Sequence, residues 1–112
     1  MSKTRETFDH ELADLRDKIL HLSEMVETAI HISIQALKEQ NLDLARQVIA
    51  GDEQINARRY DLEEQCLKLI ATQQPAAGDL RAIVAAIHIA TELERMGDYA
   101  SGIAELAIRL SD

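Results

Sequence analysis

Residue types that organise many other folds are scarce in this chain. Of its 112 residues none is tryptophan, one is cysteine and one is proline, and aromatic residues make up only 3%. The single Cys66 excludes a disulfide framework and any metal site built on paired cysteines, and it is typical of a protein from a reducing compartment. One proline and four glycines leave few turns, which predicts a small number of long elements around an aliphatic core.

Basic charge and long apolar runs are also lacking. The chain has 12 Lys and Arg residues against 20 Asp and Glu residues, so its net charge is −8 with His neutral. Nucleic acids and anionic membrane surfaces need a basic face, so neither is an expected partner. Residues 1–7 lack the apolar stretch of a signal peptide, and no apolar run reaches the roughly 18 residues of a membrane span. The sequence therefore predicts a cytoplasmic protein without membrane insertion.

Apolar residues recur at helical spacing in three long segments, and no segment alternates as a strand would. The first stripe is Phe8, Leu12, Leu15, Ile19, Leu22, Val26 and Ala29. The second is Ala45, Val48, Ile55, Leu62, Cys66 and Leu69. The third is Ala82, Ala86, Ile89, Leu93, Met96, Ala100, Ile103, Ala107 and Leu110. Each stripe predicts a helix of about 30 residues, roughly 45 Å long, with the stripe facing the core.

Two short breaks separate these helices. The first, residues 40–43, contains Asn41 and Asp43, either of which can cap a new helix. The second, residues 73–79, contains Pro75, which suits a turn or a first helical position. Because short connections make neighbouring helices antiparallel, the predicted fold is an all-α, up-down-up three-helix bundle forming a single domain over residues 1–112.

Further apolar residues lie outside the predicted core stripes. Met25 and Ile32 are off the main stripe of the first helix, and Leu80, Val84 and Ile87 form a second ridge at the start of the third. A helix that is apolar around much of its circumference is usually covered on more than one side. These residues favour self-association or docking, although a few exposed aliphatic residues are also ordinary on a soluble domain.

Oxygen-bearing side chains are expected at one height of the bundle. Glu94 and Asp98 are four residues apart and therefore neighbours on a helix surface. If Pro75 is the midpoint of the second turn, Asp52 lies level with Asp98, and Asn56 lies level with Glu94. If Asn41 is taken in the same way as the midpoint of the first turn, Glu27 and His31 of the first helix lie near the same height.

Two interpretations of this group remain open from spacing alone. Clusters of oxygen donors suit hard or borderline cations such as Mg, Mn or Fe. Alternatively, the carboxylates of Glu94 and Asp98 are solvated or pair with Arg58, Arg59 or Arg95, and Asp52 pairs with Arg59 across the helix seam. No Glu-x-x-His pair, phosphate-binding loop or nucleophile elbow occurs, and no acid, base and nucleophile come together, so the chain is not interpreted as an enzyme.

Three segments resemble the PhoU family of phosphate-signalling regulators. They are Gly51-Asp52-Glu53-Gln54-Ile55-Asn56, Gln74-Pro75-Ala76-Ala77-Gly78-Asp79-Leu80-Arg81 and Thr91-Glu92-Leu93-Glu94-Arg95-Met96-Gly97-Asp98. The resemblance implies a three-helix bundle and places the family's acid-x-x-x-acid metal motif on Glu94 and Asp98. Its companion pair corresponds to Asp52 and Asn56, where the amide removes one negative charge. The metal implied is multinuclear iron or another divalent metal.

The resemblance also implies a function. Members of this family are regulators that restrain the phosphate-starvation response by linking the ATPase of a phosphate transporter to a sensor histidine kinase. They usually carry two three-helix repeats, whereas this chain contains one. A homodimer that substitutes for the second repeat is therefore expected. The alternatives are a metal-binding or metal-sensing module and an oligomerisation module, both without a direct phosphate role.

Overall fold

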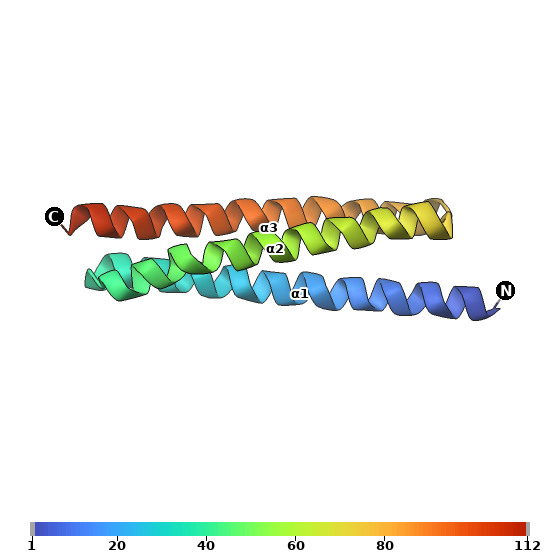
Figure 1. The fold of residues 1–112 in the computed structure, drawn as a ribbon, viewed down its shortest axis with the longest axis horizontal. Coiled ribbons are helices and arrows are strands. Elements are labelled where there is room, and N and C mark those ends of the chain that lie inside the picture. The colour runs from blue at the N-terminus through green and yellow to red at the C-terminus, as the bar shows by residue number, and fades with distance from the viewer. Residues whose placement is uncertain (1, 112) are drawn as a thin grey trace.

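The computed structural model of the chain is a bundle of three long helices (Figure 1). The helices are α1 (Ser2–Glu39), α2 (Leu42–Gln73) and α3 (Ala77–Leu110). The structure describes the backbone of residues 2–111 and the side chains of residues 5–111. The bundle measures 63 × 18 × 16 Å, and the ends of the chain lie at opposite ends of it (Figure 1). The predicted all-α, up-down-up architecture is confirmed.

Both turns lie in the predicted breaks and are closed by local backbone geometry. Helix α1 ends before Gln40, which has a positive φ of 53°. Asn41 then caps α2, because its side-chain oxygen accepts a hydrogen bond from the backbone N–H of Leu44 at 3.1 Å. In the second turn Gln74 has a φ of 45°, and Pro75 separates it from the extended N-cap residue Ala76, whose side chain makes no capping bond.

The Asn41 cap gives the first testable prediction. Replacing Asn41 with Ala removes the acceptor for the Leu44 N–H and is expected to lower the free energy of unfolding by about 1 kcal/mol. Thermal or denaturant unfolding measures the loss. Asn41→Ser retains an oxygen acceptor and is the matched control, so an equal loss in both variants would show that the cap does not stabilise α2.

The core agrees with the predicted stripes of α1 and α2. Every predicted α2 stripe residue is buried. On α1, Phe8, Leu15, Leu22 and Val26 are buried, while the other members of its stripe pack against the core from its edge. The buried face of each of these helices is formed mainly by large aliphatic side chains, which fixes which side of the helix turns inward.

The predicted stripe of α3 was partly wrong. Ala86, Ala100 and Ala107 are buried as expected, but Ala82, Ile89, Met96 and Leu110 are exposed. The residues that face the core of the bundle from α3 are Ile83, Ala86, Ala90, Gly97, Ala100, Ala104 and Ala107. The inward face is therefore made almost entirely of small residues, and it is rotated by one row from the predicted stripe.

Close approach between α2 and α3 explains this choice of face. A Cβ atom at Gly97 would lie 3.3 Å from Cγ2 of Ile55, so the space opposite α2 is already filled by that side chain. Large residues such as Met96 do not fit between the two backbones, because protein interiors are packed to near-crystalline density. They remain on the outside of α3. Among the described residues, no helix is both long and apolar enough to cross a membrane.

Candidate functional site

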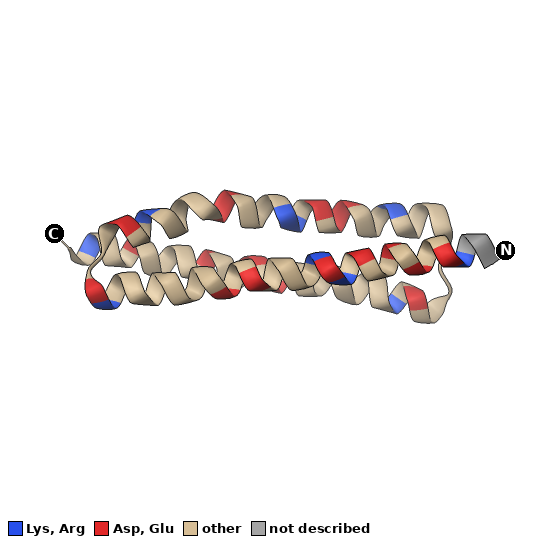
Figure 2. Ribbon diagram, turned by 90° about the horizontal axis from the view of Figure 1, so that it is seen from below, with Lys and Arg blue, Asp and Glu red and all other residues tan. Residues whose placement is uncertain are grey.

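The seam between α2 and α3 brings three of the predicted site residues together. Asp52 lies on α2, and a Cβ atom at Gly97 would be 3.7 Å from Oδ1 of Asp52, so this carboxylate rests against α3 beside Asp98. Asp98 interacts with both Asp52 and Glu94. The height predicted from Pro75 therefore places these residues correctly. Figure 2 shows acidic segments along all three helices, with basic segments interspersed among them.

Partial burial and mutual repulsion raise the pKa values in this group. Burial raises the pKa of Asp52 above its usual 3.8, the negative charges of Asp98 and Glu105 raise it further, and Ser101 opposes the shift. Burial likewise raises the pKa of Glu94 above 4.5, together with its interaction with Asp98. The buried Ser101 hydroxyl lies near Asp52 but makes no short, well-aligned hydrogen bond. The seam therefore holds negative charge that lacks full compensation.

Arg59 supplies the positive charge of the seam, and only 16% of its side chain is exposed. Its Nη2 donates a hydrogen bond to Oδ1 of Asn56 at 2.8 Å, and its Nη1 donates to both carboxylate oxygens of Glu63 at 3.2 Å. The guanidinium also lies over the ring of Tyr60, 4.1 Å from its centroid. Its charge lowers the pKa of Glu94 and partly offsets the repulsion described above.

The donor set of a single chain does not form a ready metal site. The Asn56 oxygen that was predicted to face a cation already accepts a hydrogen bond from Arg59. Among the described side chains, no group of three or more His, Cys, Asp or Glu residues is arranged to hold a metal ion. Asp52, Glu94 and Asp98 are the oxygen donors that hard cations prefer, but one chain does not place them as a complete coordination shell.

The other residues considered for this site lie elsewhere or have other partners. Glu27 and His31 are exposed on α1 and approach each other at 3.8 Å, and neither contributes to the pKa of Asp52 or Glu94. Arg95 pairs with Glu92 at 3.3 Å. Of the three arginines considered, Arg59 is the one that interacts with acidic residues of the seam, through its ion pair with Glu63 and the nearby charge of Glu94.

The raised pKa values predict that mild acidification stabilises the fold. An acid whose pKa is higher in the folded state than in the unfolded state binds its proton more tightly when folded, so its ionised form subtracts stability. The contribution of Asp52 and Glu94 to the free energy of unfolding therefore rises as the pH falls from neutral through their raised pKa values. This gain in stability is complete at a pH below the ordinary pKa values of the two groups, 3.8 for Asp52 and 4.5 for Glu94.

Unfolding measured across this pH range tests the prediction. Asp52→Asn is expected to be more stable than the wild type at neutral pH and to show a weaker dependence on pH. Asp61→Asn makes the same chemical change at an exposed position of α2 and is the matched control. If the free energy of unfolding depended on pH in the same way in both variants, burial and repulsion at Asp52 would not affect the stability of the fold.

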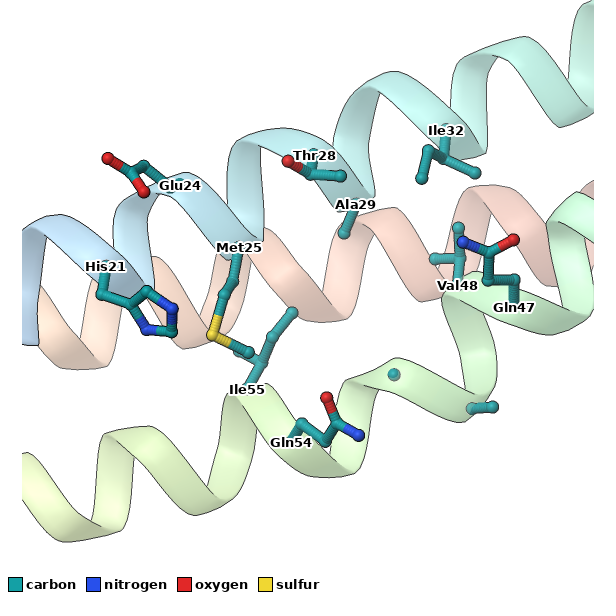
Figure 3. A pocket seen from close by; sticks show the side chains of 12 residues that line it. His21, Glu24, Met25, Thr28, Ala29, Ile32, Gln47, Val48, Gln54 and Ile55 are labelled. Atoms are coloured by element: carbon teal, nitrogen blue, oxygen red, sulfur yellow. The ribbon is translucent and has the colours of Figure 1, made fainter.

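A groove between α1 and α2 is the second candidate surface. It encloses about 530 Å³, and its apolar lining includes Met25, Ala29, Ile32, Val48 and Ile55 (Figure 3). The α2 side of the groove is free of charge and is formed by Gln47, Ala50, Gly51 and Gln54. Small residues on a helix allow another helix to approach closely, so the groove has the shape and chemistry to receive an amphipathic helix.

Some of these features could be predicted from the sequence. Met25 and Ile32 lay off the predicted core stripe, and they line this groove. Arg59 occupied an apolar position of the α2 stripe, with Glu63 four residues later, which is the spacing of a helical ion pair. The contribution of Glu63 was missed. Its signal was this spacing, combined with the unusual position of Arg59.

Comparison with known proteins identifies relatives along most of the chain. Residues 19–107 match the sequence profile described as the PhoU domain. The "phosphate-specific transport system accessory protein PhoU homolog" of Aquifex aeolicus is 42% identical over 102 residues, which cover 91% of this chain and 46% of that protein. The Escherichia coli "phosphate-specific transport system accessory protein PhoU" is 37% identical over 101 residues, covering 90% and 42%. The chain spans about half the length of the curated relatives it matches.

Proposed function

Because the chain belongs to the PhoU family, we propose that it regulates phosphate uptake and the phosphate-starvation response. The observation that carries this proposal is its similarity, over at least 90% of its length, to proteins named as accessories of the phosphate-specific transport system. The chain acts without catalysing a reaction, by binding the transporter ATPase and a sensor histidine kinase. It corresponds to one of two family repeats and works in the cytoplasm, where the lone Cys66 remains reduced.

Protein contact is supported by the apolar groove between α1 and α2. In this proposal a helix of the transporter ATPase or of the kinase lays its apolar face on Met25, Ile32 and Val48. Ala50 and Gly51 allow that helix to approach closely. The acidic character of the chain favours encounter with a basic partner surface and affects the association rate more than the affinity.

A reporter of the phosphate-starvation response tests this function. In a strain that lacks the chain, the wild type is expected to restore repression when phosphate is plentiful. Ala50→Arg places a long charged side chain in the groove and is expected to abolish repression and to weaken capture of the ATPase and kinase. Ala71→Arg makes the same change at an exposed position of α2 outside this groove and should behave as the wild type. Normal repression by Ala50→Arg would show that the groove is not the binding site for the partner. If the wild-type chain did not change the reporter signal, the proposed function itself would be rejected.

Cation binding is the second candidate function. It is favoured by the convergence of Asp52, Glu94 and Asp98, whose repulsion a divalent metal such as iron would relieve. Because one chain lacks a complete donor set, the remaining ligands would be water or a second molecule. Elemental analysis after purification tests this, and Glu94→Gln with Asp98→Asn is expected to remove any metal and its effect on the melting temperature. Metal retained by that double variant would place the binding elsewhere.

Self-association is also part of the proposal, because large hydrophobic side chains such as Leu20, Tyr99 and Leu110 are exposed on the bundle. A homodimer would supply a second three-helix unit. Light scattering of the purified chain tests the homodimer independently of any phosphate response.

A further inference from the structure

The seam between α2 and α3 carries an apolar surface as well as the acidic group described above. One row of side chains follows it on α2: Asn56, Tyr60, Glu63, Leu67 and Ile70. Another follows it on α3: Leu80, Val84, Ile87, Thr91, Glu94, Asp98, Ser101 and Glu105. Steps of three and four residues keep each row on one side of its helix. The two rows border the same seam, because the hydroxyl of Thr91 lies 3.5 Å from Oε1 of Glu63.

The half of the seam nearer the second turn is apolar and open to solvent. Leu67 is 61% exposed, Val84 40% and Leu80 37%. Ile70 and Ile87 lie half-buried in the same rows and pack against the core. Single exposed hydrophobic residues are ordinary on a protein surface, but a contiguous apolar surface marks an interaction site.

The other half of the seam is acidic. Glu94, Asp98 and Glu105 continue the α3 row, and the negative charges of Asp98 and Glu105 both act on Asp52 of α2. Arg59 is the basic residue that acts on Glu94, but its hydrogen bonds go to other side chains of α2. The seam is therefore divided along its length into an apolar half and an acidic half.

The neighbouring basic residues leave this acidic half largely unneutralised. Arg95 pairs with Glu92 at 3.3 Å. Arg109 is exposed near the end of α3, and it forms no ion pair with any of the described residues. Within the described part of the chain, the buried Oγ of Ser101 and the buried Nε of Arg59 also lack a hydrogen-bond partner. The bundle thus does not satisfy all the polar groups of its own seam.

We infer that the α2–α3 seam is the docking surface for an amphipathic helix of a partner protein, apolar in one half and rich in Lys or Arg in the other. The apolar half packs on Leu67, Leu80 and Val84, and the basic half meets Glu94 and Asp98. Leu80 and Asp98 are 18 residues apart, which corresponds to about 27 Å or five helical turns. The groove between two packed helices can receive the ridge of a third helix.

The distribution of charge and apolar surface selects this occupant over the others. The same face of a second copy would bring like charges together, and nucleic acids and anionic membranes are negative as well. A metal ion could neutralise the carboxylates, but it would leave Leu67, Leu80 and Val84 uncovered. A basic amphipathic helix covers the apolar half and neutralises the acidic half in one contact.

This surface is separate from the groove between α1 and α2. Gln54 lines that groove, whereas Asn56, two residues later, lies about 200° further around α2 and belongs to the seam. A protein that links two partners needs two separate surfaces, and the seam supplies one in addition to the groove. This link to regulation rests on the proposed function, whereas the position of the docking surface does not.

Binding of synthetic peptides tests the surface. The probe is a helical peptide of about 18 residues with leucines in one half and lysines on the same side of the other half. The control peptide has the same composition, with leucines and lysines interspersed along its length. In calorimetry with EDTA present, the wild type is expected to bind the probe about tenfold more tightly than the control, and added salt should weaken binding of the probe. Equal affinity for the two peptides, or binding only after addition of a divalent metal, would overturn the inference.

Variants of each half locate the binding site. Leu67→Glu in the apolar half is expected to weaken binding of the probe about tenfold, and Leu20→Glu, at a 62% exposed position of α1, is its matched control. Glu94→Gln with Asp98→Asn is expected to weaken binding by a similar factor and to reduce its dependence on salt. The control for this charge change is Asp61→Asn with Glu64→Gln, at exposed positions of α2 near Lys18 of α1. Circular dichroism establishes that each variant folds, and equal losses in the variants and their controls would overturn the inference.

Two further measurements separate this inference from the other proposals. Leu67→Glu is expected to leave the oligomeric state unchanged in light scattering, and conversion of a dimer to a monomer by this variant would overturn the inference, because a second copy would then cover the seam. The phosphate reporter tests the proposed function by itself. If the wild-type chain did not change the reporter signal but bound the probe as expected, the proposed function would be rejected and the docking surface would stand.

Discussion

Gly97→Leu is expected to lower the free energy of unfolding by about 2 kcal/mol. Leucine is a better helix former than glycine by up to about 1 kcal/mol, but overpacking typically costs about 1–3 kcal/mol and sometimes more. At Gly97 even a Cβ atom would lie 3.3 Å from Cγ2 of the buried Ile55. The additional leucine atoms have no free space, so α3 must move away from α2.

The same substitution at Gly51 is the matched control. A Cβ atom at Gly51 would meet no atom within 4 Å, and the residue lines the open groove between α1 and α2. Gly51→Leu is therefore expected to leave stability unchanged or to raise it by up to about 1 kcal/mol. Denaturant unfolding of both variants measures the difference. Equal stability of Gly97→Leu and Gly51→Leu would show that close contact between α2 and α3 is not needed.

The position of Gly97 also explains why the sequence predicted two helices better than the third. On α1 and α2 most of the large apolar residues gather in one row, so periodicity alone selects the buried face. On α3 two neighbouring rows are apolar, one containing Ala90 and Gly97 and the other Ile89 and Met96. The hydrophobic pattern favours the larger residues, but the space left by Ile55 admits only the smaller ones. Sequence periodicity does not report that space.

The candidate site could likewise be predicted only in part from the sequence. The common height of Asp52 and Asp98 follows from the turn at Pro75 and the constant rise of two antiparallel helices, so it could be predicted. The engagement of Asn56 by Arg59 could not, because an arginine side chain has several rotatable bonds and can reach partners on either side. Spacing permitted Arg59 to pair with Asp52, but the structure directs its hydrogen bonds to Asn56 and Glu63.

Arg59 is the residue whose loss should disturb this seam most. Arg59→Ala removes the hydrogen bonds to Asn56 and Glu63, and it removes the positive charge that acts on Glu63 and Glu94. Breaking a fully buried ion pair costs about 3–5 kcal/mol, and exposed pairs contribute less than about 1 kcal/mol. Because this pair is partly exposed, the expected loss in the free energy of unfolding at neutral pH is about 1–2 kcal/mol.

The pH dependence of that loss distinguishes electrostatics from packing. Arg59 lowers the pKa of Glu94, so its removal raises that pKa further and increases the penalty for ionised Glu94. The difference in stability between the wild type and Arg59→Ala is therefore expected to be largest at neutral pH and to shrink as Glu94 is protonated. Arg58→Ala, at the adjacent exposed position, is the control and should change stability little. A deficit for Arg59→Ala that stayed constant with pH would mean that its aliphatic stem and its contact with Tyr60 stabilise the fold, because packing against neutral groups does not titrate.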